Sequence, residues 1–310
     1  MILTATNGER PIAVTAVRDM SLDPRSPRRR LYVSDLDGTL LNSRACLSDF
    51  ARRSLTGLLA SGVRFTVATA RSAPAVRSIL GDLVTTTPII EQNGACVTDL
   101  SSGEHLAVFD IPSPIADEAL TLFRRFESEP IVACIVDGAD RLFYERPGNR
   151  GTEWYIEEKV AASDPRLACV EDVAAVRNAQ VLSITTLVDE ARARSLADAL
   201  NQVSGGQLQI RLGANGYAPA FWELSVLDVS ATKARGIELL RGAIGMEDAE
   251  LVVFGDAEND MDMFLAADWA IAVGNATPEL RALAKQVVGS NEADGVIHWL
   301  LAEHGRVGHK

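Results

Sequence analysis

The chain has 310 residues, of which 47% are hydrophobic and 23% are charged, and its formal net charge at pH 7 is −12. This composition is typical of a folded globular protein of about two domains, and the negative charge opposes nonspecific binding to nucleic acid or anionic membrane. No apolar run approaches the roughly 20 residues of a membrane-spanning helix, and the first residues lack a secretory signal pattern. We therefore expect a cytoplasmic monomer or homodimer without nucleic-acid or membrane partners.

Residues 1–30 contain several prolines and the basic cluster 28–30, which predicts a flexible N-terminal extension with at most a short strand over 12–17. From Leu31 onward, apolar strands alternate with amphipathic helices, a pattern typical of a doubly wound parallel α/β sheet. The predicted elements of this stretch are a strand at 31–33, a helix at 51–61, a strand at 63–69, a helix at 73–80 and a strand from 88 that ends in a turn at 93–94.

The pattern changes after Gly94, where an inserted α+β module is predicted. Its elements are a hairpin at 95–111, a helix at 114–128, a strand at 131–136, a stretch at 142–145, a helix at 151–161, a strand at 181–187, a helix at 190–203, and strands at 208–212 and 221–226. The α/β pattern resumes with a helix at 232–241, a strand at 251–254, a helix at 261–267, a strand at 269–273, and helices at 278–285 and 295–303. We therefore predict a discontinuous core, 31–95 with 224–310, interrupted by an inserted domain at 96–223.

Two aspartates follow the first predicted strand, in the segment Ser34–Thr39. Strand side chains alternate between faces, so Asp35 and Asp37 can project to the same side where the strand ends, and Gly38 lets the backbone turn beneath a ligand. Two carboxylates this close repel each other unless a proton or cation intervenes, and Mg²⁺ is the usual cation at an all-oxygen site. The alternative is an acidic turn, since Asp and Gly are common turn residues.

Polar residues at other strand ends would meet these aspartates, because open α/β sheets bind ligands at the carboxyl edge of their strands. Thr69 ends the second strand and can bond a phosphate oxygen, although a β-branched residue there needs no function. Lys233 falls in the first turn of a helix capped by Ser230 or Thr232, where a cation opposes the helix dipole. The alternative for an isolated lysine is a solvated position at the protein surface.

An acidic segment, Gly255–Asp262, follows the strand at 251–254. Its acidic residues have an ordinary explanation in helix capping and dipole chemistry. However, four carboxylates converging at one edge, Asp35, Asp37, Asp256 and Asp260, would be unstable without a divalent cation.

The cysteines and histidines carry no comparable signal. The four cysteines are widely spaced without a C-x-x-C pair, which predicts free, mostly buried thiols in a reducing compartment. The four histidines, His105, His298, His304 and His309, lack metal-ligand spacing and are predicted to lie at the surface.

Taken together, these segments resemble the haloacid-dehalogenase (HAD) superfamily of phosphatases over about residues 31–303. The resemblance rests on the segments Asp35–Leu41, Ala68–Arg71, Asn93–Ala95, Lys233 and Gly255–Asp260. The long insertion, together with Ala272–Ala276 and Ser290–Val296, resembles the Cof-type branch with a C2 (type IIB) cap. The resemblance implies a Rossmann-like core that carries an inserted α+β cap.

The resemblance also implies a role for each matching residue. Asp35 would be the nucleophile that forms an aspartyl-phosphate, and Asp37 would protonate the leaving alcohol and then activate water. Mg²⁺ would be held by the Asp35 side chain, the Asp37 carbonyl and Asp256. Thr69 and Lys233 would hold phosphoryl oxygens, and Lys233 would also neutralise the nucleophile. The remaining implied site residues are Asp260, which would support the lysine or the water shell of the metal, and the phosphate- or substrate-binding residues Leu36, Ala70, Arg71, Asn93 and Asn259.

The implied function is a Mg²⁺-dependent phosphatase acting on small phosphorylated metabolites. Sugar phosphates are the first expectation, with flavin or vitamin-precursor phosphates and nucleotides as alternatives. Asp37 favours phosphate esters, because hydrolytic dehalogenases of the superfamily lack this second aspartate. In the cap, Arg150, Trp154 and Tyr155 are candidates for leaving-group contacts or for packing and surface roles.

Two other functions remain open, a C2-capped phosphosugar mutase and a non-catalytic phosphometabolite-binding protein. The sequence departs from the family pattern in two places, because Ala70 and Ala234 stand where glycine is common. Both substitutes are small, so the departures bear on loop geometry.

Overall fold

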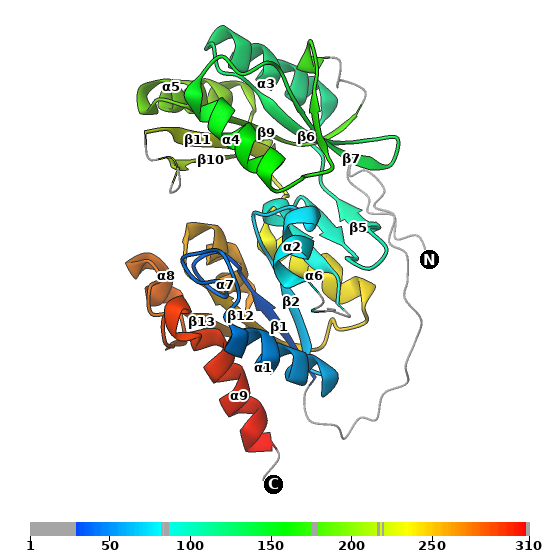
Figure 1. Cartoon of the computed structure of the whole chain (residues 1–310), viewed down its shortest axis with the longest axis vertical. Helices are drawn as coiled ribbons and strands as arrows, with labels where there is room; N and C mark the ends of the chain where they lie inside the picture. Colours follow the sequence, from blue (N-terminus) through cyan, green and yellow to red (C-terminus); the bar gives the residue numbers. More distant parts are fainter. Residues whose placement is uncertain are drawn as a thin grey trace. The chain divides into compact units, whose positions relative to one another are not determined.

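The computed structural model describes residues 29–81, 83, 87–174, 179–215, 218 and 220–307. The chain forms two compact units, one made of the described residues up to Val108 and from Thr232 onward, the other of Phe109–Ala231 (Figure 1). The short strand expected at 12–17 falls outside the described residues. Among the described residues, no helix is long and apolar enough to cross a membrane.

The first unit contains a parallel sheet whose five described strands run in the order β14-β13-β12-β1-β2. These strands are β1 (Arg30–Ser34), β2 (Arg64–Val67), β12 (Glu250–Gly255), β13 (Trp269–Ala272) and β14 (Gln286–Val287). Central β1 reads Leu-Tyr-Val over its apolar stretch and is buried on both faces, as a parallel strand requires. The predicted parallel α/β sheet is therefore confirmed.

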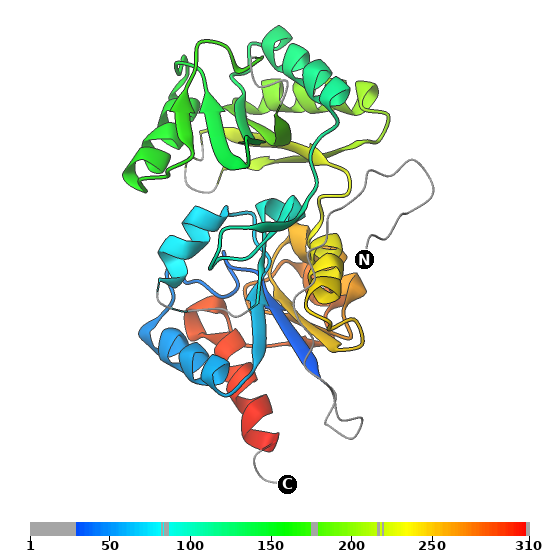
Figure 2. The ribbon, with the colours of Figure 1, turned by 90° about the vertical axis from the view of Figure 1, so that its right-hand side faces the viewer.

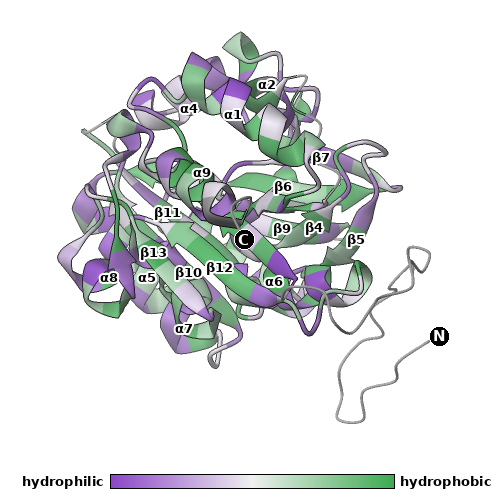
Figure 3. Cartoon of the chain, turned by 90° about the horizontal axis from the view of Figure 1, so that it is seen from below, coloured by the Kyte–Doolittle hydropathy of each residue, from purple (hydrophilic) through white to green (hydrophobic). Residues whose placement is uncertain are grey.

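Helices lie on both faces of this sheet (Figure 2). They are α1 (Asp49–Ala60), α2 (Ala73–Leu80), α6 (Lys233–Ala243), α7 (Met261–Ala266), α8 (Pro278–Leu283) and α9 (Gly295–Val307). Helix α1 contacts α9, and α6 contacts α7. Hydrophobic residues line β12, whereas the surrounding helices contain both hydrophobic and hydrophilic residues (Figure 3). Apolar residues of these helices, such as Leu55 of α1 and Ile237 of α6, are buried in the core with the sheet.

A small antiparallel sheet completes the first unit. It consists of β3 (Ile89–Glu91), β4 (Cys96–Thr98) and β5 (His105–Val108), in that order. A parallel bridge from Ala68 to Ile90 connects β3 to the end of β2. Sequence placed the start of the insertion at residue 96, but β4 and β5 pair with β3, and Leu106 and Ala107 join the core of the first unit.

The second unit is built on a sheet whose six described strands run in the order β10-β11-β9-β6-β7-β8. Its elements are α3 (Ser113–Arg125), β6 (Ile131–Val136), β7 (Ala139–Tyr144), α4 (Arg150–Ala161), β8 (Leu167–Cys169), β9 (Gln180–Val188), α5 (Glu190–Val203), β10 (Leu208–Ala214) and β11 (Trp222–Asp228). Apolar residues of α3 and α5 pack against the sheet around fully buried Phe123. Because β11 pairs with both β9 and β10, residues 224–231 belong to this unit, whereas sequence placed them in the core.

Candidate active site

The centre of the site is a lysine held between two carboxylates. Asp35 follows β1, and its backbone N–H donates to the carbonyl of Phe254 in β12. Lys233 begins α6 after the N-cap Thr232, and its Nζ donates to Asp35 Oδ1 at 2.6 Å and to Asp260 Oδ1 at 2.7 Å. Lys233 and Asp260 are completely buried and Asp35 nearly so. The surface-lysine alternative is thereby excluded.

Burial governs the electrostatics of this group. It raises the pKa of Asp35 to about 8 even though the Lys233 ammonium opposes the shift, and the nearby carboxylate of Asp260 adds to it. Burial alone would lower the pKa of Lys233, but Asp35 and Asp260 outweigh burial and keep the amine protonated. One ammonium therefore serves two buried carboxylates, so negative charge exceeds positive charge within this buried group when both carboxylates are ionised.

Asp256 adds a third carboxylate at the end of β12. Its Oδ1 accepts a hydrogen bond from Thr39 Oγ1 at 2.8 Å. A Cβ added at Gly38, where φ is +77°, would lie 2.4 Å from Asp256 Oδ2, so glycine is required for the close approach of the two loops. Burial raises the pKa of Asp256 to about 6, with the Thr39 hydrogen bond acting in the opposite direction.

This donor set fits a hard divalent cation. Carboxylate oxygens of Asp35, Asp256 and Asp260 all lie within 4.8 Å of one another. Asp260 already uses Oδ1 for Lys233 and Oδ2 for the backbone N–H groups of Asp256 and Ala257. Asp35 and Asp256 are thus the carboxylates best placed to ligate Mg²⁺, and a divalent cation would offset the cost of burying them.

Asp37 is engaged differently from Asp35. Arg71 donates to both of its carboxylate oxygens, from Nε at 2.7 Å and from Nη2 at 2.6 Å. This two-pronged pair fixes the carboxylate plane. The expected contact of Arg71 with substrate stays a prediction, and the structure adds a contact with Asp37 that the sequence did not predict. Thr69 is fully buried, and its hydroxyl accepts from the backbone N–H of Arg71 at 3.1 Å while keeping its own proton to donate to a ligand.

Asn93 and Asn259 connect the two edges of the site. Asn259 Nδ2 donates to Asn93 Oδ1 at 3.3 Å, and the Asn93 backbone N–H donates to the carbonyl of Thr69. Asn93 adopts the left-handed conformation, with φ of 57°. These contacts bring together segments that lie 166 residues apart.

Gly94 permits the loop after β3 to approach the start of α6. Its φ is +101°, and a Cβ at this position would lie 2.2 Å from the carbonyl oxygen of Thr232. We expect Gly94→Ala to lower the free energy of unfolding by about 2–4 kcal/mol, because backbone strain and overpacking add. Urea unfolding followed by circular dichroism measures this change. Gly57→Ala is the matched control, since nothing lies within 4 Å of its added Cβ on α1 and alanine favours helix. Equal midpoints for the two variants would contradict the prediction.

The other predicted residues contribute through backbone or lie in the second unit. The Leu36 side chain is fully buried, so only its backbone can meet a ligand, and Ala70 is exposed. On α4, Arg150 is exposed and forms an ion pair with Glu153, while burial raises the pKa of Tyr155. Trp154 is partly exposed on the same helix.

Three supporting residues had no role in the sequence analysis. Asn275 Nδ2 donates to the Gly38 carbonyl, and Asn291 Nδ2 donates to the Leu41 carbonyl, so both amides hold the loop after β1. Asp262 Oδ2 accepts from the backbone N–H of Ala234 in the first turn of α6. For Asn275 the available signal was its place directly after the predicted strand at 269–273, whereas Asn291 follows β14, a strand that the sequence did not predict.

Comparison with known proteins identifies the family of the chain. The family model of haloacid dehalogenase-like hydrolases matches residues 32–300. HMP-PP phosphatase of Escherichia coli K12 is 26% identical over 280 residues, which cover 87% of this chain and 94% of that protein. The 5-amino-6-(5-phospho-D-ribitylamino)uracil phosphatase YitU of Bacillus subtilis is 23% identical over 274 residues, or 87% of this chain and 96% of that protein. Among solved structures, a sugar phosphatase of HAD subclass IIB superposes with a TM-score of 0.70 at 21% identity, covering 89% of this chain and 99% of that one.

The fold is that of a parallel α/β protein in which acidic residues gather around a buried lysine at one edge of the sheet. More specifically, the chain belongs to the haloacid dehalogenase-like hydrolase family.

Proposed function

We propose that this chain is a Mg²⁺-dependent phosphatase that hydrolyses phosphate monoesters of small metabolites through an aspartyl-phosphate on Asp35. Sugar phosphates are the first expected substrates, followed by flavin or vitamin-precursor phosphates and nucleotides. The observation that carries the proposal is the buried Asp35–Lys233–Asp260 group beside Asp256. Phosphoryl transfer asks a protein mainly for positioning and charge neutralisation, and a buried ammonium bonded to the nucleophile supplies both.

In the first step, Asp35 Oδ2 attacks phosphorus, because Oδ1 is held by Lys233. The bond from phosphorus to the ester oxygen breaks, and Asp37 delivers a proton to that oxygen. In the second step, water attacks phosphorus, its proton passes to Asp37, and the bond to Asp35 breaks. Arg71 orients Asp37 between these transfers, and the hydroxyl of Thr69 and the amide of Asn259 bind phosphoryl oxygens. Mg²⁺ held by Asp35, Asp256 and the Asp37 carbonyl would neutralise phosphoryl charge.

We further propose that the second unit, Phe109–Ala231, is a C2-type cap that selects the leaving group. The relatives support a small phosphorylated metabolite as substrate, since those reported above are named for HMP-PP, a ribityl phosphate and sugar phosphates. A cap that shields the site from water would favour transfer over side reactions. The choice among these substrates rests on cap residues.

The proposal is tested by measuring phosphate release from sugar phosphates, nucleotides, and flavin and pyridoxal phosphates. We expect release from at least one class with Mg²⁺ and none with EDTA, because the buried carboxylates need a divalent cation. Release that persists unchanged in EDTA would contradict the Mg²⁺ dependence. Absence of release from every compound, together with no acid-stable or trapped phosphoenzyme on the wild type, would favour a binding protein.

Thr39 provides a test of the metal site that does not alter a ligand. Thr39→Val removes the hydrogen bond to Asp256 Oδ1 in a fully buried position without a large change in shape. We expect the Mg²⁺ concentration for half-maximal binding to rise by about 10–100-fold, as is typical when a group orienting a ligand is lost. Isothermal titration with Mg²⁺ measures it. Thr56→Val removes a hydrogen bond from an exposed hydroxyl to a backbone carbonyl within α1, so it should leave the Mg²⁺ affinity unchanged. Identical affinities in both variants would contradict a role of the Thr39 hydrogen bond in orienting Asp256 toward the metal.

A further inference from the structure

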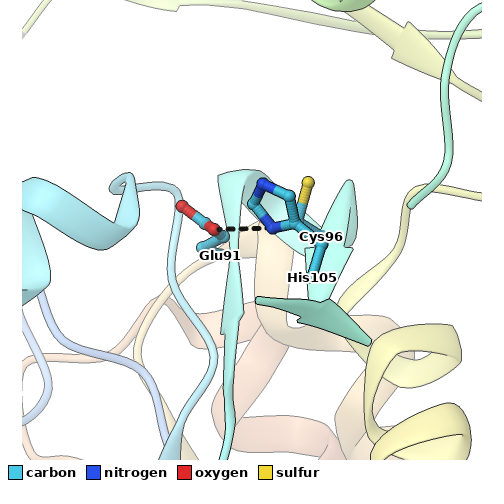
Figure 4. A group of neighbouring side chains, drawn as sticks. All are labelled: Glu91, Cys96 and His105. Carbon is cyan, nitrogen blue, oxygen red and sulfur yellow. Dashed lines mark ion pairs between the residues drawn. The ribbon is translucent and has the colours of Figure 1, made fainter. Parts of the chain in front are cut away.

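One face of the small sheet β3-β4-β5 gathers three side chains of metal-binding type, Glu91, Cys96 and His105 (Figure 4). Glu91 lies opposite Cys96 in the β3–β4 register. Thr98, two residues further along β4, lies opposite His105 of β5. Opposed residues and residues two apart share a face, so the register alone brings the three side chains together. One ligand atom from each lies within 4.8 Å of the other two.

The carboxylate of Glu91 is anchored on both sides. Its Oε2 accepts from the backbone N–H of Ala73, and its Oε1 accepts from Thr98 Oγ1 at 2.5 Å. His105 Nδ1 lies 2.8 Å from Thr98 Oγ1 and 3.8 Å from Glu91 Oε1. Glu91 is fully buried, and a buried carboxylate is costly unless positive charge stands close to it. Either an imidazolium or a bound cation could supply that charge.

The donor chemistry distinguishes this cluster from the active site. Asp35 and Asp256 offer only oxygen, which suits Mg²⁺, whereas one thiolate, one imidazole and one carboxylate suit Zn²⁺. With bonds of about 2.0–2.3 Å, neighbouring ligands of tetrahedral zinc lie about 3.3–3.6 Å apart. The 3.8 Å between His105 Nδ1 and Glu91 Oε1 is close to that value, and closing the set onto a metal needs side-chain shifts of about 1 Å.

We propose that Glu91, Cys96 and His105 bind Zn²⁺, with water in the fourth position. Glu91 and Cys96 are fully buried, while the side chain of His105 is 13% exposed, so solvent reaches the cluster beside the imidazole. On binding, the thiol of Cys96 loses its proton to solvent and its sulfur forms the bond to the metal. The backbone N–H of Ala73, which donates to Glu91, lies at the start of α2, two residues after Arg71. Zinc at Glu91 would therefore fix the segment that carries Arg71.

Cobalt(II) is the probe that separates the two metal sites, because only a thiolate ligand gives a sulfur-to-cobalt charge-transfer band. The full chain, kept reduced, is titrated with Co²⁺ in excess Mg²⁺, and absorption is recorded in the near ultraviolet and the visible. We expect the charge-transfer band to saturate at one equivalent and Zn²⁺ to displace it. Cys96→Ser should abolish the band, and His105→Ala should weaken Co²⁺ binding by more than the about 10–100-fold typical of an outer-shell partner.

Cys134→Ser is the matched control, since Cys134 is also buried but lies in β6 of the second unit; it should keep the band. Cys46→Ser tests adventitious binding at an exposed thiol. A wild-type titration without the band would overturn the proposal and leave a Glu91–His105 ion pair. Should Cys96→Ser fail to fold, His105→Ala decides, because unchanged affinity in that variant also overturns the proposal. The readout is spectroscopic and involves no turnover, so its outcome is independent of the phosphatase assay.

Discussion

Asp35→Asn is expected to abolish phosphate release while raising the stability of the metal-free protein. Activity falls by at least about 10⁴-fold, the order of loss when a nucleophile that acts within a unit is removed. Stability rises because the lone ammonium of Lys233 then serves a single carboxylate, that of Asp260. The asparagine side chain can still accept from Lys233 at the position of Asp35 Oδ1, since the substitution preserves shape.

The stability gain should depend on pH in a defined direction. Burial raises the pKa of Asp35 from 3.8 to about 8 in the folded protein, with Lys233 opposing the shift. As pH rises, Asp35 therefore loses its proton in the unfolded chain before it does so in the folded protein. The free energy of unfolding of the wild type consequently falls as pH rises from 3.8 to about 8. Asparagine does not titrate, so the difference in melting temperature between Asp35→Asn and wild type should be larger at pH 8 than at pH 5.

The measurement is thermal unfolding in EDTA at both pH values, alongside phosphate release with Mg²⁺. Asp99→Asn is a suitable control, because Asp99 is partly exposed in the β4–β5 turn and its pKa is lowered by hydrogen bonds from Ser101 and Ser102. Asp99→Asn should therefore lower the melting temperature at neutral pH, whereas Asp35→Asn should raise it. A variant at Asp35 that retains turnover would remove this residue as the nucleophile, whatever its melting temperature.

Much of the fold follows from local sequence pattern. The strand at 131–136 and the helix at 190–203 coincide with β6 and α5. A continuous apolar run marks the strand, and apolar periodicity after the capping Asp189 marks the helix. The final helix, predicted to end at 303, continues through Gly305 to Val307, since helix ends are weakly specified by sequence. Hairpin β4–β5 was assigned to the insertion because the sequence pattern of a hairpin is the same in either unit. The pairing of β4 with β3 places the hairpin in the first unit.

In the candidate site too, some residues could be predicted from local sequence pattern and others could not. Asp35, Lys233 and Asp260 were singled out because each follows a strand or opens a helix at one sheet edge, a property that sequence can express. The Arg71–Asp37 pair was not expected, because it depends on where two loops meet rather than on either loop's pattern. The same holds for Cys96 and His105: their spacing along the chain matches no metal motif, and they meet only through a sheet register containing a bulge. Of the four thiols, Cys96 and Cys134 are buried and Cys46 and Cys169 are exposed.

Lys233→Met is expected to be the most destabilising single change in the site. The side chain is completely buried and bonds both Asp35 and Asp260, so its loss leaves adjacent carboxylates without a cation. Breaking a buried ion pair from one side costs about 3–5 kcal/mol, and phosphate release should fall to background. Urea unfolding in EDTA measures the first effect. Lys285→Met, at an exposed lysine over the ring of Trp269, should change the free energy of unfolding by less than about 1 kcal/mol.

A second substitution separates charge balance from simple loss of packing. In Lys233→Met with Asp260→Asn, one of the two uncompensated carboxylates is neutral, and the asparagine can still accept from the backbone N–H groups that Asp260 Oδ2 serves. The double variant should therefore be more stable than Lys233→Met alone, with a coupling of about 1–3 kcal/mol, and should stay inactive because no ammonium remains at the nucleophile. If the double variant is instead the less stable of the two, the lysine acts by filling space, and charge neutralisation of Asp35 is no longer the reason for its burial.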